Sequence, residues 1–218
     1  MRFPCETEEI SSMQISYQQE ILRKLVHLSS IWMVFVMWYA GRLPAFLIFS
    51  VLAILNLIVE YARYKKVPVI TPLYEALFKN MLRESNGKFR PSGSPPYLAS
   101  AAVTSLLFPL PFSVISFLCM MFGDTAAALI GRKFGKHKFF NGKSVEGCAA
   151  FLITDWLIVT GAFFMIGFSW IILVCGLVGV VIAMIAELFN EELHLDDNFS
   201  IPLLVGGMFW IGILLTRI

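Results

Sequence analysis

Residues 170–188, WIILVCGLVGVVIAMIAEL, decide the fold class of this chain, because no charged residue interrupts them before Glu187. A helix of about 20 apolar residues, rising about 1.5 Å per residue, crosses a hydrocarbon core of about 30 Å. The composition of the 218 residues agrees with such a placement, since 58% are hydrophobic and only 15% are charged. The stretch therefore predicts a membrane-spanning helix in a polytopic membrane protein.

Further apolar stretches lie along the rest of the chain, and together they predict an all-α fold with about seven transmembrane helices. The expected spans are 25–40, 43–62, 97–108, 112–131, 145–166, 170–188 and 199–216. The third is short and ends at Pro109 and Pro111, so we expect it to begin earlier or to be partly re-entrant. Residues 1–22 are expected to form a cytoplasmic N-terminal segment, and residues 23–218 a single multi-span domain. A helical pattern over 72–81 predicts an amphipathic helix on the cytoplasmic surface.

Basic residues divide very unevenly between the two sides of the predicted membrane. With the N-terminus inside, all of the 17 lysines and arginines except Arg42 and Arg217 fall on the cytoplasmic side. Because cytoplasmic loops carry the excess of such residues, this predicts a cytoplasmic N-terminus and a single chemical face there. The four cysteines show no paired spacing that indicates a zinc site or a disulfide framework, and no nucleic-acid module is present. No cleavable signal is expected, and the compact chain is compatible with a bacterial plasma membrane.

The sequence RKLVH, with Arg23, Lys24 and His27, lies at the mouth of the first predicted span. Arg23 and His27 are four residues apart and so share a helix face. Basic residues at a span end are commonly snorkelling anchors, and for Arg23 and Lys24 alone that interpretation is favoured. His27 enters the apolar run, which makes a functional site as good an explanation as an anchor.

The segment FGDTAAALIGRKFGKHKFFNGKSVEG, residues 122–147, carries the most specific chemistry. Asp124 is expected about two turns inside a span, where an unpaired carboxylate costs on the order of 2.5 to 3.5 kcal/mol. Such a residue needs a partner or a cation, whereas close helix packing by the small residues after it does not require it. Asp155 is the other carboxylate expected inside the membrane. For Asp155 we favour a polar interhelical contact over a proton relay.

The loop that follows is basic, carries Gly135 and Gly142, and leads into the start of the fifth span. Free backbone N–H groups and the helix dipole attract anions there, so we favour polyphosphate binding over a purely topogenic role. The glycine spacing differs from that of the GxxxxGKS phosphate loop. Ser144 is expected to cap the helix, and Glu146 to complete the cap or reach a metal. The anion-binding residues expected in this region are Arg132, Lys136, Lys143 and Ser144.

The segment AELFNEELHLDDNFSIP, residues 186–202, places Asp196, Asp197 and Asn198 in a row before the last span. Hard oxygen ligands of this type suit Mg2+ when the ion also holds substrate phosphates. The alternative is a solvated acidic turn that caps the last helix through Asn198. Asp124 and the basic loop on the same face favour a metal and nucleotide site, because phosphoryl transfer depends on positioning and on neutralising charge.

These motifs resemble those of the CTP-dependent lipid-alcohol kinases, the group of dolichol kinase, phytol or farnesol kinase and yeast-type diacylglycerol kinase. The matching stretches are RKLVH, GDTAAALIGRKFGKHK with KSVEG, and ELFNEELHLDDNFSIPL. The resemblance runs from about residue 23 to residue 202 and rests on the order and spacing of the motifs. It implies a catalytic membrane domain that transfers the γ-phosphate of CTP, with Mg2+, to a polyprenol or dolichol, phytol, farnesol or diacylglycerol.

The resemblance assigns residues to motifs but not to individual catalytic roles. We expect Asp196 or His27 to help deprotonate the acceptor hydroxyl. Bulky Trp32 stands near the place where the family has a small residue soon after His27, which predicts a different acceptor channel. The expected catalytic residues are Asp124, Asp196, Asp197 and His27; the expected nucleotide-binding residues are Arg23, Lys24, Arg132, Lys136, Lys143, Ser144 and Glu146; and the expected metal ligands are Asp124, Asp197 and Asn198.

Two other functions compete with the kinase. The central segment is also similar to that of phosphatidate cytidylyltransferase, which makes CDP-diacylglycerol. The C-terminal signature of that enzyme is absent from the sequence, and LDDNFSIPL stands in its place. A small transporter is the non-enzymatic alternative, but transporters tend to show internal repeats and polar midplane residues, and the sequence has no repeat. The kinase is therefore the favoured function.

Overall fold

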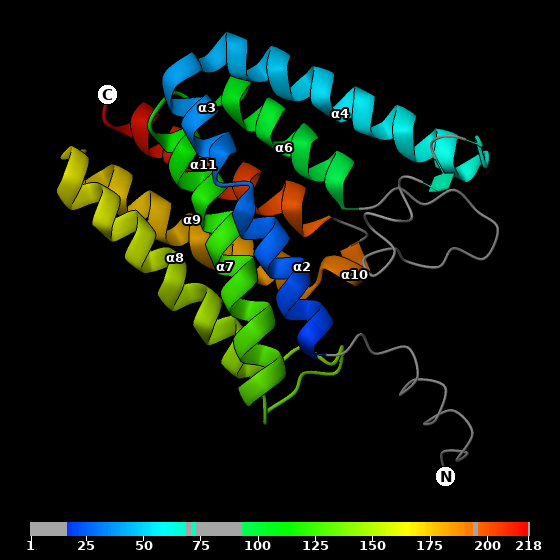
Figure 1. Ribbon diagram of the computed structural model, residues 1–218. Helices are drawn as coiled ribbons and strands as arrows, with labels where there is room; N and C mark the ends of the chain where they lie inside the picture. Colours follow the sequence, from blue (N-terminus) through cyan, green and yellow to red (C-terminus); the bar gives the residue numbers. More distant parts are fainter. Residues whose placement is uncertain (1–16, 69–70, 73–92, 194–195, 218) are drawn as a thin grey trace.

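The computed structural model describes residues 17–68, 71–72, 93–193 and 196–217, and nearly all of these are helical (Figure 1). Within this part of the chain, the strand-like pairing that occurs is a single antiparallel bridge between Lys138 and Ser144. The predicted all-α fold is therefore confirmed. The predicted amphipathic helix over 72–81 lies, from residue 73 onward, outside the described residues.

The helices follow the apolar stretches of the sequence closely. They are α2 (Tyr17–Ser29), α3 (Trp32–Ala40), α4 (Arg42–Tyr64), α6 (Ser94–Leu107), α7 (Phe112–Phe134), α8 (Val145–Ile166), α9 (Trp170–Leu188), α10 (Asn190–Leu193) and α11 (Asp197–Leu215). Six helical stretches of the described chain are long and apolar enough to cross a membrane: α2 with α3, α4, α7, α8, α9 and α11.

The third predicted span is the exception. It forms α6, which begins three residues earlier than expected, at Ser94, and has 14 residues. A helix of that length extends about 21 Å, which is shorter than a hydrocarbon core of about 30 Å. The expectation of about seven transmembrane helices is thus confirmed for six of them.

The first predicted span also begins earlier than expected. Helix α2 starts at Tyr17, so the RKLVH motif lies well inside a helix. A short turn after Ser29 separates α2 from α3. Residues 17–22 therefore belong to the same helix as Arg23, Lys24 and His27, and Glu20 in its first turn is fully buried.

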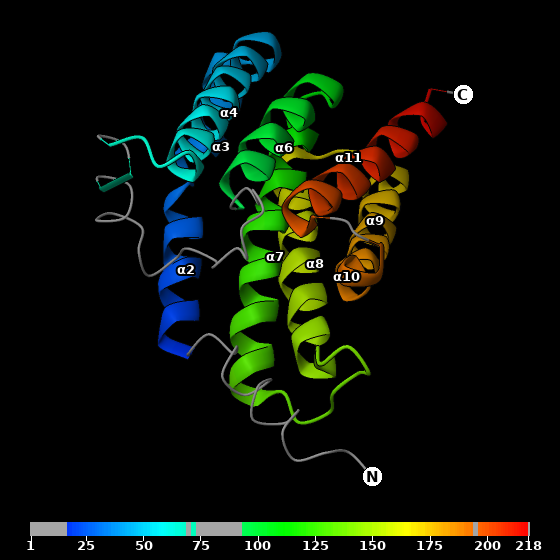
Figure 2. The same cartoon turned by 90° about the vertical axis from the view of Figure 1, so that its right-hand side faces the viewer.

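Helix α7 lies in the middle of the bundle and contacts α2, α3, α6, α8 and α11 (Figures 1 and 2). Small residues bring it close to α8, because a Cβ added at Gly147 would lie 3.2 Å from the Cα of Gly131. Glycines let helix backbones approach in this way. The close contact joins the cytoplasmic end predicted for α7 to the start of α8, which are the two ends of the basic loop.

Local capping sets the starts of two helices that carry motif residues. The Ser144 hydroxyl accepts a hydrogen bond from Gly147 N at 3.1 Å and caps α8, as the sequence predicts. At α11 the cap is Asp196, whose carboxylate accepts from Asn198 N at 3.1 Å. The alternative in which Asn198 caps the last helix is therefore not what the structure shows, because the cap is Asp196 and Asn198 lies in the first turn of α11.

Candidate functional site

A buried ion pair joins the first and second motifs. Lys24 Nζ of α2 donates to Asp124 Oδ2 of α7 at 2.5 Å, and only 5% and 10% of the two side chains are exposed. His27 Nε2 lies 3.9 Å from the same oxygen. Lys24 and His27 are three residues apart and so point from one helix face. The partner expected for Asp124 is therefore present, and Lys24 rather than Arg23 joins His27 there.

Glu20 makes a second link between α2 and α7 that the sequence analysis missed. Its Oε1 accepts a hydrogen bond from Arg23 at 2.7 Å, and its Oε2 lies 3.3 Å from Arg132. The glutamate side chain is 1% exposed, whereas the arginines are 39% and 38% exposed. One buried carboxylate thus holds two half-exposed arginines side by side. The spacing of Glu20 and Arg23 on one helix face was the available signal.

The loop between α7 and α8 is tied to the end of α9. Lys143 Nζ pairs with Glu187 Oε1 at 2.9 Å and also donates to the carbonyl of Glu187. Asn141 donates to the carbonyl of Leu188 at 2.5 Å. Cations and donors at a helix C-terminus satisfy its free carbonyls. Lys143, expected as a phosphate ligand, is therefore in contact with α9.

Glu146 and Lys136 take different positions on this loop. Glu146 Oε1 lies 2.8 Å from His137 Nδ1 and accepts from the backbone N–H of His137. This contact joins the loop to the first turn of α8, where the Glu146 carboxylate also accepts a hydrogen bond from its own backbone N–H. Lys136 is exposed. It is free to reach an anion that approaches the end of the bundle.

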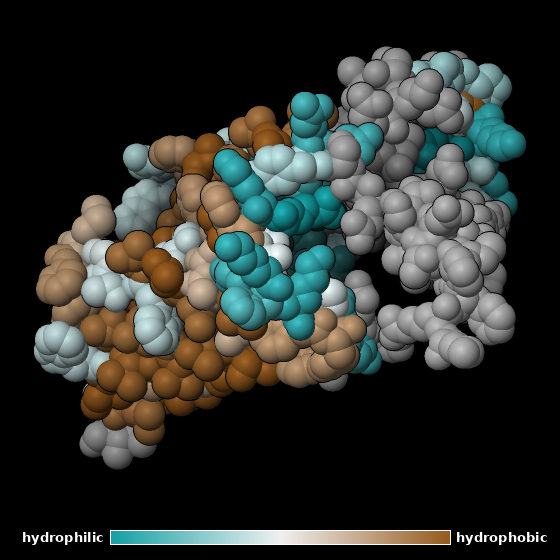
Figure 3. Space-filling model, turned by 90° about the horizontal axis from the view of Figure 1, so that it is seen from below, coloured by the Kyte–Doolittle hydropathy of each residue, from teal (hydrophilic) through white to brown (hydrophobic). Residues whose placement is uncertain are grey.

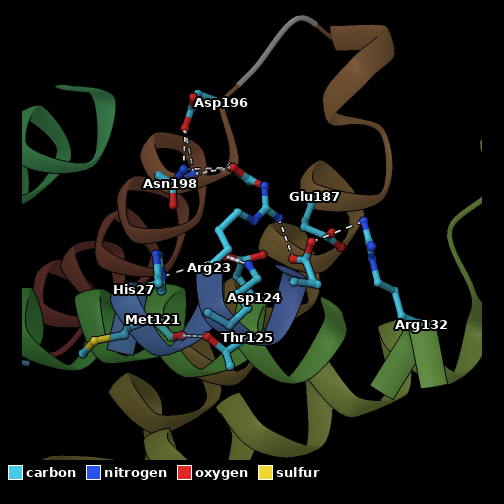
Figure 4. Close-up of polar contacts among 12 residues, drawn as sticks. Arg23, His27, Met121, Asp124, Thr125, Arg132, Glu187, Asp196 and Asn198 are labelled. Atoms are coloured by element: carbon cyan, nitrogen blue, oxygen red, sulfur yellow. Dashed lines mark hydrogen bonds and ion pairs between the residues drawn. The ribbon is translucent and has the colours of Figure 1, made fainter. Parts of the chain in front are cut away.

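The third motif lies near the first two. Asn198 Nδ2 donates to Asp196 Oδ1 at 3.1 Å and to Asp197 Oδ1 at 3.3 Å. Asp197 lies close enough to Asp124 and Lys24 for their charges to act on it. Figure 4 shows Arg23, His27, Asp124, Glu187, Asp196 and Asn198 gathered from α2, α7, α9 and α11. The three sequence motifs therefore converge in the structure.

Hydrophilic residues mark this end of the molecule. In the view from below, they gather beside an apolar surface that covers much of the remaining visible face (Figure 3). That end holds the start of α2, the end of α7 and the loop before α8 (Figure 1). A polar end on an apolar bundle suits chemistry at a membrane surface.

The donor set fits Mg2+ only together with a substrate. Among the described residues no group of three or more His, Cys, Asp or Glu side chains forms a metal cage. Mg2+ usually takes one or two carboxylates and completes its coordination with phosphates and water. Asp124 and Asp197 provide two carboxylates of that kind, with the Asn198 carbonyl nearby in sequence.

Asp155 on α8 stands apart from these contacts. It is fully buried, and neither carboxylate oxygen has a hydrogen-bond partner within the part of the chain that the structure describes. It packs against Gly123 of α7, where an added Cβ would lie 2.5 Å from both oxygens. The expected interhelical contact exists, but it is a packing contact and not a polar one.

The chain is similar to several known proteins. It is 29% identical over 188 residues to an uncharacterised protein of Rickettsia prowazekii, covering 83% of this chain and 88% of that protein. It is 28% identical over 198 residues to a phytol kinase of Synechocystis sp., covering 88% of this chain and 79% of the kinase. It is 29% identical over 162 residues to CTP-dependent diacylglycerol kinase 1 of Schizosaccharomyces pombe, covering 66% and 70%.

The chain is a distant homologue of the CTP-dependent lipid kinases. No family model matches it. No solved structure matches it either. Homology to these kinases agrees with the resemblance found in the motifs.

Proposed function

We propose that the protein is an integral-membrane kinase that transfers the γ-phosphate of CTP to the hydroxyl of a lipid alcohol, with Mg2+. The observation that carries the proposal is the buried contact between Lys24 and Asp124, which lie 100 residues apart in sequence. It joins two motifs that resemble those of CTP-dependent lipid kinases. The lipid alcohol is a polyprenol or dolichol, phytol, farnesol or diacylglycerol.

The acidic residues are proposed to hold the metal and the basic residues the nucleotide. Mg2+, when bound with CTP, neutralises charge that develops on the transferred phosphoryl group. Half-exposed Arg23 and Arg132, both in contact with Glu20, are proposed to bind phosphate oxygens, since guanidinium groups recognise them well. The proposed metal ligands are Asp124, Asp197 and Asn198, and the proposed nucleotide ligands are Arg23, Lys24, Arg132, Lys136, Lys143, Ser144 and Glu146.

The chemical step requires a proton acceptor. The acceptor hydroxyl oxygen forms a bond to the γ-phosphorus, the bond from that phosphorus to the oxygen bridging to the β-phosphate breaks, and CDP leaves. The hydroxyl proton passes to His27 or Asp196. His27 is the better supported of the two, because its buried Nε2 has no hydrogen-bond partner among the described residues, whereas Asp196 Oδ1 is used in the cap of α11.

The proposed setting is a bacterial plasma membrane, with the site facing the cytoplasm. CTP is a water-soluble substrate and would reach the polar end of the bundle from that side. The lipid alcohol would enter laterally between helices, with its hydroxyl at the level of the inner headgroups. The multi-span domain from residue 23 to 218 is proposed as the catalytic unit.

The test follows each phosphorus atom of CTP. Purified protein in detergent is incubated with Mg2+, a panel of lipid alcohols and phosphatidate, and CTP labelled at either the α or the γ phosphorus. Transfer of γ label to an extracted lipid is the expected result, and the labelled lipid identifies the acceptor. Transfer of α label would instead show a cytidylyltransferase. No transfer from either position, with CTP-stimulated flux into vesicles, would indicate a transporter.

A further inference from the structure

Tyr97, at the start of α6, connects three helices at the proposed acceptor site. Its ring centroid lies 4.7 Å from that of His27 on α2 and 5.3 Å from that of Phe117 on α7. Only 8% of the residue is exposed. The tyrosine ring therefore packs against the imidazole of His27 on one side and against buried Phe117 on the other.

The hydroxyl of Tyr97 adds a polar contact to this ring packing. It lies 2.6 Å from Ser30 Oγ, and Ser30 Oγ in turn donates to the carbonyl of His27. The ring and the hydroxyl thus constrain both the side chain and the backbone of His27. A residue held in two places has less freedom to rotate away, which is how enzymes keep a catalytic group in position.

The constrained imidazole presents an unsatisfied nitrogen. His27 Nε2 is buried and has no hydrogen-bond partner in the described part of the chain, and it lies 3.9 Å from Asp124 Oδ2. A buried polar atom left without a partner costs on the order of 1 to 3 kcal/mol. A bound ligand whose hydroxyl donates a hydrogen bond to His27 Nε2 would remove this cost.

We propose that Tyr97 is a positioning residue that holds His27 Nε2 toward the acceptor hydroxyl beside Asp124. The inference rests on the proposed function, in which His27 Nε2 takes the hydroxyl proton while the oxygen bonds to the γ-phosphorus and CDP leaves. Tyr97 itself transfers no proton. It acts through the orientation of His27, together with Ser30.

The first test compares Tyr97→Phe with Tyr39→Phe. The phenylalanine ring introduced at position 97 would keep the contact with His27, and only the hydroxyl would be lost. We expect a fall in kcat of about tenfold, smaller than the 100-fold or greater loss typical of removing a general base, with the KM for CTP unchanged. Tyr39, on α3, is 81% exposed, and its loss of a hydroxyl should change neither value. An unchanged kcat in Tyr97→Phe would overturn the inference.

A double-mutant cycle separates positioning from a general structural effect. Residues that act through one another show non-additive changes. In a His27→Gln background, Tyr97→Phe should therefore cause no further fall in kcat. A full additional tenfold fall would show that Tyr97 acts independently of His27 and would contradict the proposal. Ser30→Ala removes the same link between Tyr97 and His27, so it should lower kcat in the same way. It serves as the test variant if Tyr97→Phe does not fold.

A spectroscopic measurement does not depend on activity. The chain has three histidines, so protein labelled with ¹⁵N-histidine gives few signals, and His27→Gln identifies the His27 signal by its loss. Tyr97→Phe should shift that signal and leave the other two unchanged. An unchanged His27 signal would overturn the positioning role. Wild-type protein that transfers no phosphate would overturn the proposed function instead, so the two failures are distinguishable.

Discussion

At the scale of single residues, the pair of Lys24 and Asp124 has the largest energetic consequence. Removing two charges from water is costly, and their attraction offsets that cost only when both are present and well placed. The 2.5 Å contact and the low exposure of both side chains meet that condition. Each residue therefore stabilises the burial of the other.

We predict that Lys24→Met and Asp124→Asn each lower the free energy of unfolding by about 3 to 5 kcal/mol, because each leaves one buried charge unpaired. The double variant should lose less than the sum of the two single losses. Unfolding in detergent at increasing denaturant measures all three. Asp124→Asn should also abolish phosphate transfer while the protein remains in the membrane fraction.

The matched control is His137→Gln. His137 pairs with Glu146 at 2.8 Å, but its side chain is 79% exposed, and exposed ion pairs contribute little to stability. Strictly additive losses at Lys24 and Asp124 would show that the pair is not coupled. Normal transfer by Asp124→Asn would remove Asp124 from the catalytic site.

At the scale of secondary-structure elements, the contact between α7 and α8 governs the placement of Asp124. Gly123, next to Asp124, leaves space that the carboxylate of Asp155 fills. At the other end of the same contact, Gly131 and Gly147 bring the helix backbones together beside the Ser144 cap. Because protein interiors are close-packed, a substitution at the contact between α7 and α8 is expected to shift the part of α7 that carries Asp124.

We predict that Gly123→Ala destabilises the protein by about 1 to 3 kcal/mol, the usual effect of overpacking. Its Cβ would lie 2.5 Å from both carboxylate oxygens of Asp155. Adding Asp155→Ala should restore much of the lost stability, because it removes the colliding atoms and an unpartnered carboxylate together. Thermal unfolding in detergent, followed by circular dichroism, provides the measurement.

Gly161→Ala serves as the control for this prediction. A Cβ at Gly161 of α8 meets nothing within 4 Å, and alanine is favoured over glycine in a helix by roughly 0.5 to 1 kcal/mol. The same substitution should therefore stabilise the protein slightly at Gly161 and destabilise it at Gly123. A similar effect at both sites would contradict the packing argument.

At the scale of the whole molecule, the chain separates a polar end from an apolar bundle. Helix α4 exposes many large apolar side chains, among them Leu47, Val51 and Ile58. Such a surface suits contact with lipid chains. Arg23 of α2 and Arg132 of α7, both held on Glu20, lie at the end of the bundle where the motifs converge.

We predict that the loop between α7 and α8 faces the cytoplasm and that the turn before α9 faces outward. In a cysteine-free background, Ser169→Cys should react with a membrane-impermeant maleimide in intact cells. Lys138→Cys should react only after permeabilisation. Both positions are exposed in the structure. The reverse pattern would place the proposed site on the outer side and would exclude cytoplasmic CTP as its substrate.

The sequence by itself determined the long helices and the cap of α8. A run of apolar residues such as 170–188 needs no distant partner to form a membrane helix, since its own backbone hydrogen bonds are satisfied within it. Ser144 likewise caps α8 through a hydrogen bond to Gly147, three residues away. The sequence also indicated the three motifs and the need of Asp124 for a partner.

Only the tertiary structure decided which side chains meet. The identity of the partner of Asp124, the role of Glu20 between two arginines, the contact of Lys143 with Glu187, and the position of Tyr97 against His27 all depend on how helices pack. Packing combines the faces of several helices, and no local pattern states which faces will touch. Hydropathy determines that a helix enters the membrane, whereas shape and charge between helices determine what it can do there.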